Sequence, residues 1–237
     1  MATERYEKYF DEICKEDIDE VLTISSTASQ IIYEKFKIKL DDPKETAVIF
    51  SKTFEAILDF LQNLEKDYSE FKINLCNRFV VGYTTIESEE DEKEGNFMVY
   101  IRHLNSLNTS MDNDSDNESL KATELAVQWN TDNILDQPKI IKDIASRAYE
   151  KLKKLDMYLV SSEVIMPIFI TTYENIINYL KIRRKELDKF EYEINFASIF
   201  YIGARESEDD TADIYIRPNI ESKLKLKNDA IATAKHE

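Results

Sequence analysis

The segment Ile73-Asn74-Leu75-Cys76-Asn77-Arg78-Phe79-Val80-Val81-Gly82 returns later in the chain as Ile194-Asn195-Phe196-Ala197-Ser198-Ile199-Phe200-Tyr201-Ile202-Gly203. Four of the ten positions are identical, and matched positions differ by a constant 121 (194 − 73). The triplet Glu-Ser-Glu follows each copy, at 87–89 and at 206–208, and Tyr-Ile-Arg then occurs at 100–102 and at 215–217. This repeated order of segments indicates that the chain consists of two related halves.

The match continues upstream with more substitutions. Residues 54–61 (Phe-Glu-Ala-Ile-Leu-Asp-Phe-Leu) match residues 173–180 (Tyr-Glu-Asn-Ile-Ile-Asn-Tyr-Leu) at a difference of 119 (173 − 54). Farther upstream, Ala28-Ser29-Gln30 matches Ala145-Ser146-Arg147 at a difference of 117 (145 − 28). Solenoid arrays use shorter repeats and need at least about three of them. Two long copies instead predict a pseudo-dimer, in which related halves pack about an approximate two-fold axis.

Hydrophobic periodicity predicts the elements of the first half. Apolar residues at helical spacing predict helices over 4–22, interrupted near Asp17, over 26–38 and over 43–67. Asp42 and Pro43 are typical of an N-cap and a first helical residue, and Glu45 completes a capping box. From Lys72 the hydrophobic period changes to two, which predicts one strand running up to the acidic run 87–94 and an antiparallel strand over 97–104.

The second half is predicted to repeat this plan, with helices over 138–155 and 162–189 and strands over 192–206 and 211–217. The expected fold is α+β: internally duplicated helix-helix-β-hairpin units form a pseudo-two-fold antiparallel sheet of four strands, covered by helices. The expected organisation is a first repeat with its N-terminal helix (1–104), an acidic polar linker (105–119), and a second repeat (120–237). The second repeat is expected to carry a short leading helix at 120–130 and a C-terminal tail.

Composition limits the classes of protein to consider. Apolar residues form 43% of the 237-residue chain, yet no apolar run reaches the roughly 18 residues of a membrane span. Its start lacks a basic region followed by an apolar one, so we expect a protein that is not secreted. Two unrelated cysteines suggest the cytoplasm, or a viral particle assembled there. The net charge of −16 disfavours direct nucleic-acid binding, and the basic stretch 181–185 suits a helix C-terminus.

The two acidic hairpin tips are the first candidate partner-binding sites. Their carboxylates could clamp a basic partner or hold hard cations, or they could be solvated turn residues that prevent edge-to-edge strand pairing. The repetition of the Glu-Ser-Glu triplet keeps the binding interpretation open. The candidate residues are Glu87, Glu89, Glu90, Asp91, Glu206, Glu208, Asp209 and Asp210.

Two further groups are weaker candidates. Arg102 and Arg217 end the repeated Tyr-Ile-Arg triplets, and they could bind a carboxylate or phosphate or pair with acidic residues of their own hairpins. Carboxylates at alternate positions, Asp112, Asp114 and Asp116, resemble the start of a calcium loop. The turn glycine of such a loop is absent, so a polar linker is the preferred interpretation and no metal site is assigned.

Catalytic constellations are scarce in the sequence. Of the two histidines, only His103 lies within a predicted element, and no zinc-ligand spacing occurs. Three glycines are too few for a phosphate-binding loop, and no cofactor is expected. We therefore predict that the chain is not an enzyme.

The sequence favours a non-catalytic structural or adaptor protein that acts through protein–protein interfaces in a larger assembly, such as a virus or phage virion. Its expected partners are other proteins or further copies of itself, with no membrane contact. Two alternatives stay open. One is an acidic inhibitor that mimics nucleic acid, and the other is a carboxylate- or metal-dependent hydrolase or transferase.

Overall fold

The computed structural model describes residues 2–64, 70–75, 79–86, 96–103, 137–159, 161–187, 192–196, 200–206 and 212–218. The acidic run 87–94, the linker 105–119, the predicted helix 120–130 and the tail after residue 218 lie outside them. The first part contains α1 (Ala2–Ile13), α2 (Ile18–Phe36), α3 (Pro43–Leu64), β1 (Glu70–Leu75), β2 (Phe79–Ile86) and β3 (Asn96–His103). The second contains α5 (Gln137–Lys153), η2 (Ser162–Val164), α6 (Ile165–Glu186), β4 (Tyr192–Phe196), β5 (Phe200–Glu206) and β6 (Ala212–Pro218).

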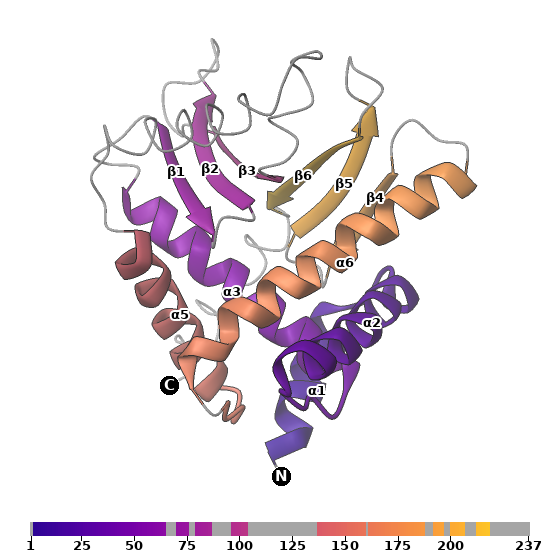
Figure 1. The fold of residues 1–237 in the computed structure, drawn as a ribbon, viewed down its shortest axis with the longest axis vertical. Helices are drawn as coiled ribbons and strands as arrows, with labels where there is room; N and C mark the ends of the chain where they lie inside the picture. Colours follow the sequence, from indigo (N-terminus) through magenta and orange to yellow (C-terminus); the bar gives the residue numbers. More distant parts are fainter. Residues whose placement is uncertain are drawn as a thin grey trace, which may run out of the picture.

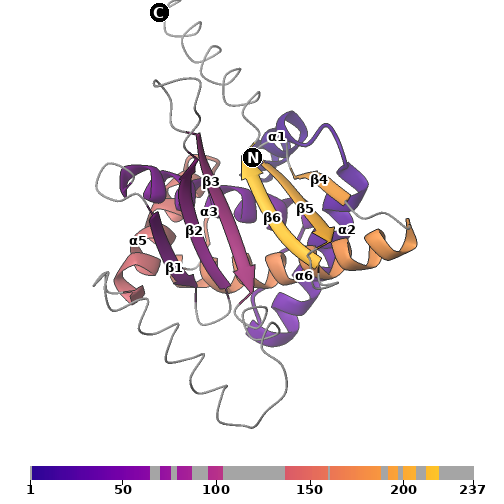
Figure 2. The ribbon, with the colours of Figure 1, turned by 90° about the horizontal axis from the view of Figure 1, so that it is seen from above.

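The fold is a mixed one in which the strands lie on one side of the helices, as Figures 1 and 2 show. The strands form two antiparallel three-stranded sheets, in the orders β1-β2-β3 and β4-β5-β6. The expected single sheet of four strands is therefore wrong. Strands β3 and β6 lie side by side where the two sheets meet (Figure 2).

The difference arises because each long predicted strand is two strands. In the first half the chain reverses between Leu75 and Phe79, which face each other across β1 and β2. In the second half Phe196 and Phe200 face each other in the same way. Apolar residues resume at Phe79 after two polar positions and at Ile199 after one, so hydrophobic periodicity alone did not locate the turns. The predicted pairing of β2 with β3 is confirmed.

Both sheets have the same register along their central rows. Ile73 faces Val81, which faces Ile101, and all three are buried. The corresponding buried row of the second sheet consists of Ile194, Ile202 and Ile216. These two rows place the apolar faces of the sheets against the helices.

The interruption predicted near Asp17 is confirmed, because α1 ends at Ile13 and Asp17 has a left-handed backbone (φ 51°). The expected gap between residues 22 and 26 is wrong, because α2 runs through it. The hydroxyls of Thr23, Thr27 and Ser29 each donate to the carbonyl four residues earlier. These bonds satisfy the polar side chains within the helix.

Local start signals operate at α3 and at η2, the short turn that precedes α6. The Lys44 amide donates to Asp42 Oδ1 (2.9 Å), and Glu45 Oε2 accepts from the Asp41 amide, one residue before the expected position. In the second half the Glu163 amide donates to Ser161 Oγ (3.2 Å). Ser161 is the N-cap of η2, which leads directly into α6.

One continuous hydrophobic core joins the described parts of both halves. Helix α2 packs against α6, and α3 packs against α5, so helices of one half bury faces on helices of the other. At the centre the rings of Phe50 and Phe169 stack with centroids 4.7 Å apart. Phe54 contacts Phe200 of β5 at 4.6 Å. The described residues of the two halves thus share one core.

Candidate functional site

The structure describes few of the predicted site residues. Glu206 ends β5 opposite Ala212, whereas the other candidate carboxylates of both tips, and those of the 112–116 segment, lie outside the described residues. The backbones of Arg102 and Arg217 occupy matching positions, opposite Val80 and Tyr201 on the central strands. Their strands, β3 and β6, are neighbours. Their side chains are not described, so the proposed anion site remains a prediction.

A charge network between α1, α3 and α5 was not predicted. Lys52 Nζ donates to both carboxylate oxygens of Glu55 at 2.9 Å, and the Tyr9 hydroxyl donates to Glu55 Oε1 (3.1 Å). Lys151 Nζ lies 2.7 Å from Asp59 Oδ2 and 3.9 Å from Glu55 Oε2. Two cations and two carboxylates are thus matched, and one carboxylate binds groups from all three helices.

Burial shifts the proton affinities of this network. The Lys52 side chain is 13% exposed, and desolvation lowers its pKa from the ordinary value, although Glu55 partly opposes this. Burial raises the pKa of the Tyr9 hydroxyl, and the Glu55 carboxylate raises it further. Lys52 Nζ lies 4.2 Å from the centre of the Tyr9 ring, in cation–π geometry. The network is suited to holding the three helices together.

Sequence reasoning missed this network because a helical stripe shows only which face of α3 is polar. Lys52 and Glu55 are three positions apart and could have been recognised as an ion pair. That α1 and α5 cover the pair depends on tertiary packing, for which the sequence gives no local signal.

A second polar cluster joins the α1–α2 connection to the outer edge of β4. The Asn195 amide donates to Asp17 Oδ2 (2.8 Å), and Asn195 Nδ2 donates to Glu16 Oε2 (2.9 Å). Tyr192 on the same strand hydrogen-bonds to Arg183 of α6. Asp17 thereby occupies the backbone donor of Asn195 at a sheet edge that would otherwise be open to another strand.

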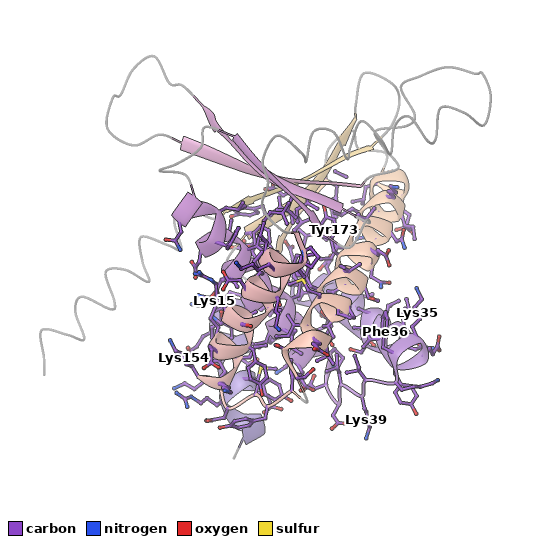
Figure 3. All side chains as sticks on the ribbon, turned by 60° about the vertical axis from the view of Figure 1, so that its left-hand side comes forward. Lys15, Lys35, Phe36, Lys39, Lys154 and Tyr173 are labelled. Carbon is purple, nitrogen blue, oxygen red and sulfur yellow. The ribbon has the colours of Figure 1, made fainter. Side chains whose placement is uncertain are left out.

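Two surface regions combine lysines with exposed aromatic rings. We define the α2 corner as Tyr33, Lys35, Phe36, Lys37 and Lys39, and the α5 corner as Tyr149, Lys153, Lys154 and Tyr158. Exposed aromatic side chains are notable at both corners: Tyr33 is 52%, Phe36 45% and Tyr158 71% exposed. Figure 3 places Lys35, Phe36 and Lys39 on the outside of the helical layer, below the sheets, with Lys154 on its other side. Both corners are accessible to a partner.

Within the corners some lysines are already engaged. Lys39 pairs with Asp41 at 2.9 Å, and Lys153 pairs with Glu150 at 3.0 Å. Lys37 Nζ donates to the Glu34 carbonyl. Lys35 and Lys154 form no ion pair with a residue that the structure describes. Among the lysines of the two corners, these two are therefore the ones left without a described hydrogen-bond or ion-pair partner.

The described part of the chain lacks a metal centre and a membrane-spanning helix. It contains no group of three or more His, Cys, Asp or Glu residues placed to hold a metal ion. None of its helices has the length and hydropathy needed to cross a bilayer. Comparison with protein-family models, curated proteins and solved structures found no match.

Proposed function

We propose that this protein is a non-catalytic structural or adaptor component that binds other protein chains through its surface. The observation that carries the proposal is the exposure of aromatic rings beside lysines at the α2 and α5 corners. Tyrosine and phenylalanine are enriched at the centres of protein interfaces, where burying a ring contributes much of the binding free energy. Nearby charges select the partner and speed the encounter.

We also propose that the two halves arose by internal duplication. Several local details recur about 120 positions apart, as in the longer repeats. Thr53 and Thr172 donate to the Ile49 and Ile168 carbonyls, both at 2.7 Å and at a difference of 119 (172 − 53). Lys37 and Asp156, also 119 apart (156 − 37), both have φ of 58°. The two halves thus share side-chain hydrogen bonds, left-handed backbone positions and strand register at equivalent residues, which supports a common plan.

The contacts between halves support an approximate two-fold relation. Phe50 and Phe169 differ by the same 119 positions (169 − 50) and stack on each other, as residues beside a two-fold axis would. In α2 and α5 the buried positions correspond at 120, with Ala28 and Ala148 both fully buried. The match of residues 28–30 with residues 145–147, at a difference of 117, does not align the buried faces of α2 and α5. A duplicated scaffold would offer two related surfaces to neighbours.

A pull-down from the native source followed by mass spectrometry tests the proposed function. Wild-type bait is compared with bait that carries Phe36→Ser and Tyr158→Ser, and with a control that carries Ile182→Ser. Ile182 is 57% exposed at the C-terminal end of α6, away from both corners, so the control removes a similar apolar surface. We expect a protein captured by wild type and control but lost from the corner variant. Equal capture by all three baits, or no capture by wild type, contradicts the proposal.

A further inference from the structure

Helix α1 covers one face of the first half of α3. Lys44 Nζ lies 5.4 Å from the centre of the Phe10 ring, and Glu55 accepts a hydrogen bond from the Tyr9 hydroxyl. Residues three or four positions apart share one face of a helix, so the covered face is a single stripe of α3. The stripe consists of Lys44, Val48, Ser51 and Glu55. Its two central residues are fully buried, as expected beneath a docked helix.

The corresponding stripe of α6 is partly exposed. The difference of 119 between the halves (163 − 44) places this stripe at Glu163, Pro167, Ile170 and Glu174. Its two central residues are apolar, and both are only partly buried, unlike those of α3. The α6 stripe therefore presents apolar surface where the α3 stripe has α1 upon it.

The end of α2 borders this stripe. Helices α2 and α6 pack against each other, and burial together with the nearby Glu20 carboxylate raises the pKa of Tyr179. Glu20 is in the first turn of α2 and Tyr179 is in the second half of α6, so the two helices run antiparallel. The last turn of α2 thus lies toward the first half of α6, with Phe36 45% exposed on the outside of the helical layer (Figure 3). We call the α6 stripe, together with Phe36 and Lys37, the α6 seat.

The charged positions of the α6 seat are reversed relative to those around α1. Lys44 pairs with Asp11 of α1 at 2.9 Å. Asp156, after the end of α5, pairs with Arg5 of α1 at 2.9 Å. In the seat the counterparts of these two α1-binding residues, at a difference of 119, are Glu163 and Lys37. Both are exposed, and neither forms an ion pair with a described residue, so a helix with the charges of α1 would meet like charges there.

We propose that the α6 seat binds an amphipathic helix of another protein, placed as α1 is placed on α3. This helix carries an acidic residue followed directly by a bulky apolar residue. Four positions after that apolar residue it carries a second one, followed directly by a basic residue. These are the positions of Arg5, Tyr6, Phe10 and Asp11 in α1, with both charges exchanged.

The chemistry of the seat accounts for each of these positions. The two bulky residues cover Pro167, Ile170 and Phe36, just as Tyr6 and Phe10 are buried under α1. The acidic residue meets Lys37 and the basic residue meets Glu163, so charge selects which amphipathic helix binds. The inference rests on the proposed function and names the kind of partner that the α2 corner would bind.

The alternative occupant is a segment of the same chain. Glu124, Leu125 and Trp129, which lie outside the described residues, have the spacing of the acidic residue and the two apolar residues. However, the side chains of Phe36 and Tyr33 stay exposed in the structure of the complete chain. These exposures favour a helix supplied by another protein.

Fluorescence anisotropy with the full chain tests the proposal. The probe is a labelled peptide of residues 1–15 that carries Arg5→Glu and Asp11→Lys, and the natural 1–15 peptide is its control. We expect the probe to bind about tenfold more tightly, because two repulsive surface pairs become attractive. The variant Phe36→Ser should weaken binding of the probe, whereas Ile182→Ser, which removes a similar apolar surface elsewhere, should not.

Exchanging the charges of the seat provides the decisive arm. Lys37→Asp with Glu163→Lys copies the first half, and Asp156 already shows that aspartate accepts the left-handed backbone of Lys37. In this variant the natural peptide should bind more tightly than the probe. No binding of the probe, equal binding of the two peptides by wild type, or an unchanged preference in the variant each overturns the proposal.

Two further outcomes separate the alternatives. If the emission of Trp129, the only tryptophan, shifts on adding the probe and equally in Phe36→Ser, the chain's own segment occupies the seat and an external partner is overturned. If the probe fails to bind but the pull-down still loses a protein with the corner variant, the α6 seat is overturned while the proposed function stands.

Discussion

Asp17, Lys37 and Asp156 have left-handed backbones, with φ of 51°, 58° and 58°. This conformation places the Cβ atom close to the following carbonyl oxygen, and glycine avoids the clash. The chain contains only three glycines, so other residues occupy these turns. At Lys37 the backbone amide bonds to the Tyr33 carbonyl and closes the end of α2.

We expect Lys37→Gly to increase the free energy of unfolding by about 0.5–1 kcal/mol. Relief of the left-handed strain, about 1–2 kcal/mol, should exceed the extra flexibility that glycine gives to the unfolded chain. Urea denaturation measures the change. Asp156→Gly is the comparison, because it relieves the same strain but loses an ion pair with Arg5 (2.9 Å). A less stable Lys37→Gly variant contradicts this account.

The ion pair between Lys52 and Glu55 should show strong coupling. Removing one partner leaves a charge in a largely buried site, so we expect Lys52→Met or Glu55→Leu to cost about 2–3 kcal/mol each. The double variant should recover most of that loss, because no unpaired charge remains and two apolar side chains replace the pair. A double-mutant cycle by urea denaturation measures the coupling, and additive single effects would contradict it.

Buried tyrosines should make the protein sensitive to alkali. Burial raises the pKa of Tyr9 and Tyr173 above the ordinary value of 10.0. Above about pH 10 the unfolded chain loses these protons while the folded chain keeps them. Unfolding then releases protons, so the free energy of unfolding should fall as the pH rises. Urea denaturation between pH 8 and 11 measures this fall.

The variant Tyr9→Phe isolates part of this effect. It should lose stability less steeply above pH 10 than the wild type, because one of the two shifted hydroxyls is gone. Lys52 acts in the opposite direction, because its pKa is lowered in the folded chain from 10.5. Identical slopes for wild type and Tyr9→Phe would show that the Tyr9 proton does not contribute.

At the scale of elements, the caps of α3 and of η2, the turn that leads into α6, make a pair for measurement. Asp42→Ala and Ser161→Ala each remove the side chain that accepts an amide proton at the helix start. We expect each to cost about 1 kcal/mol. The Asp42 change should cost more, because its bond is shorter and its charge interacts favourably with the helix dipole. Thermal unfolding compares them, and no loss at Asp42 would exclude a capping role.

Local signals determined which elements the sequence could predict. The start of α3 follows from Asp42 and Pro43, and the break near Asp17 and the pairing of β2 with β3 were predicted as well. The reversal after Leu75 was missed, because no glycine or proline marks it and apolar residues resume at Phe79 after only two polar positions. The predicted count of strands was wrong for the same reason in both halves.

The candidate sites also differ in whether a local sequence signal could identify them. Amino-acid composition pointed to the acidic hairpin tips and the 112–116 segment, which lie almost entirely outside the described residues. The network around Glu55 needs α1 and α5 to come together on α3, which no spacing within α3 indicates. The exposure of Phe36 was equally hidden, because a helical stripe cannot tell a covered aromatic residue from an uncovered one.

At the scale of the whole molecule, the halves interlock. Helix α2 packs on α6 and α3 packs on α5, and Tyr173 of α6 donates to the Ile101 carbonyl of β3 (3.4 Å). The α1–α2 connection binds β4 through Asn195. Each half therefore buries apolar and polar groups on the other, and stability should be a property of the complete chain.

We expect fragments 1–104 and 120–237 to lack cooperative unfolding when each is prepared alone, because α2 and α3 would lose their partners α6 and α5. Mixing the two fragments should restore helical circular dichroism and a cooperative thermal transition. The full chain cleaved within 105–119 after folding is the control, and it should stay assembled on a sizing column. A fragment that unfolds cooperatively alone, with stability near that of the full chain, would mean that the contacts between halves contribute little to folding.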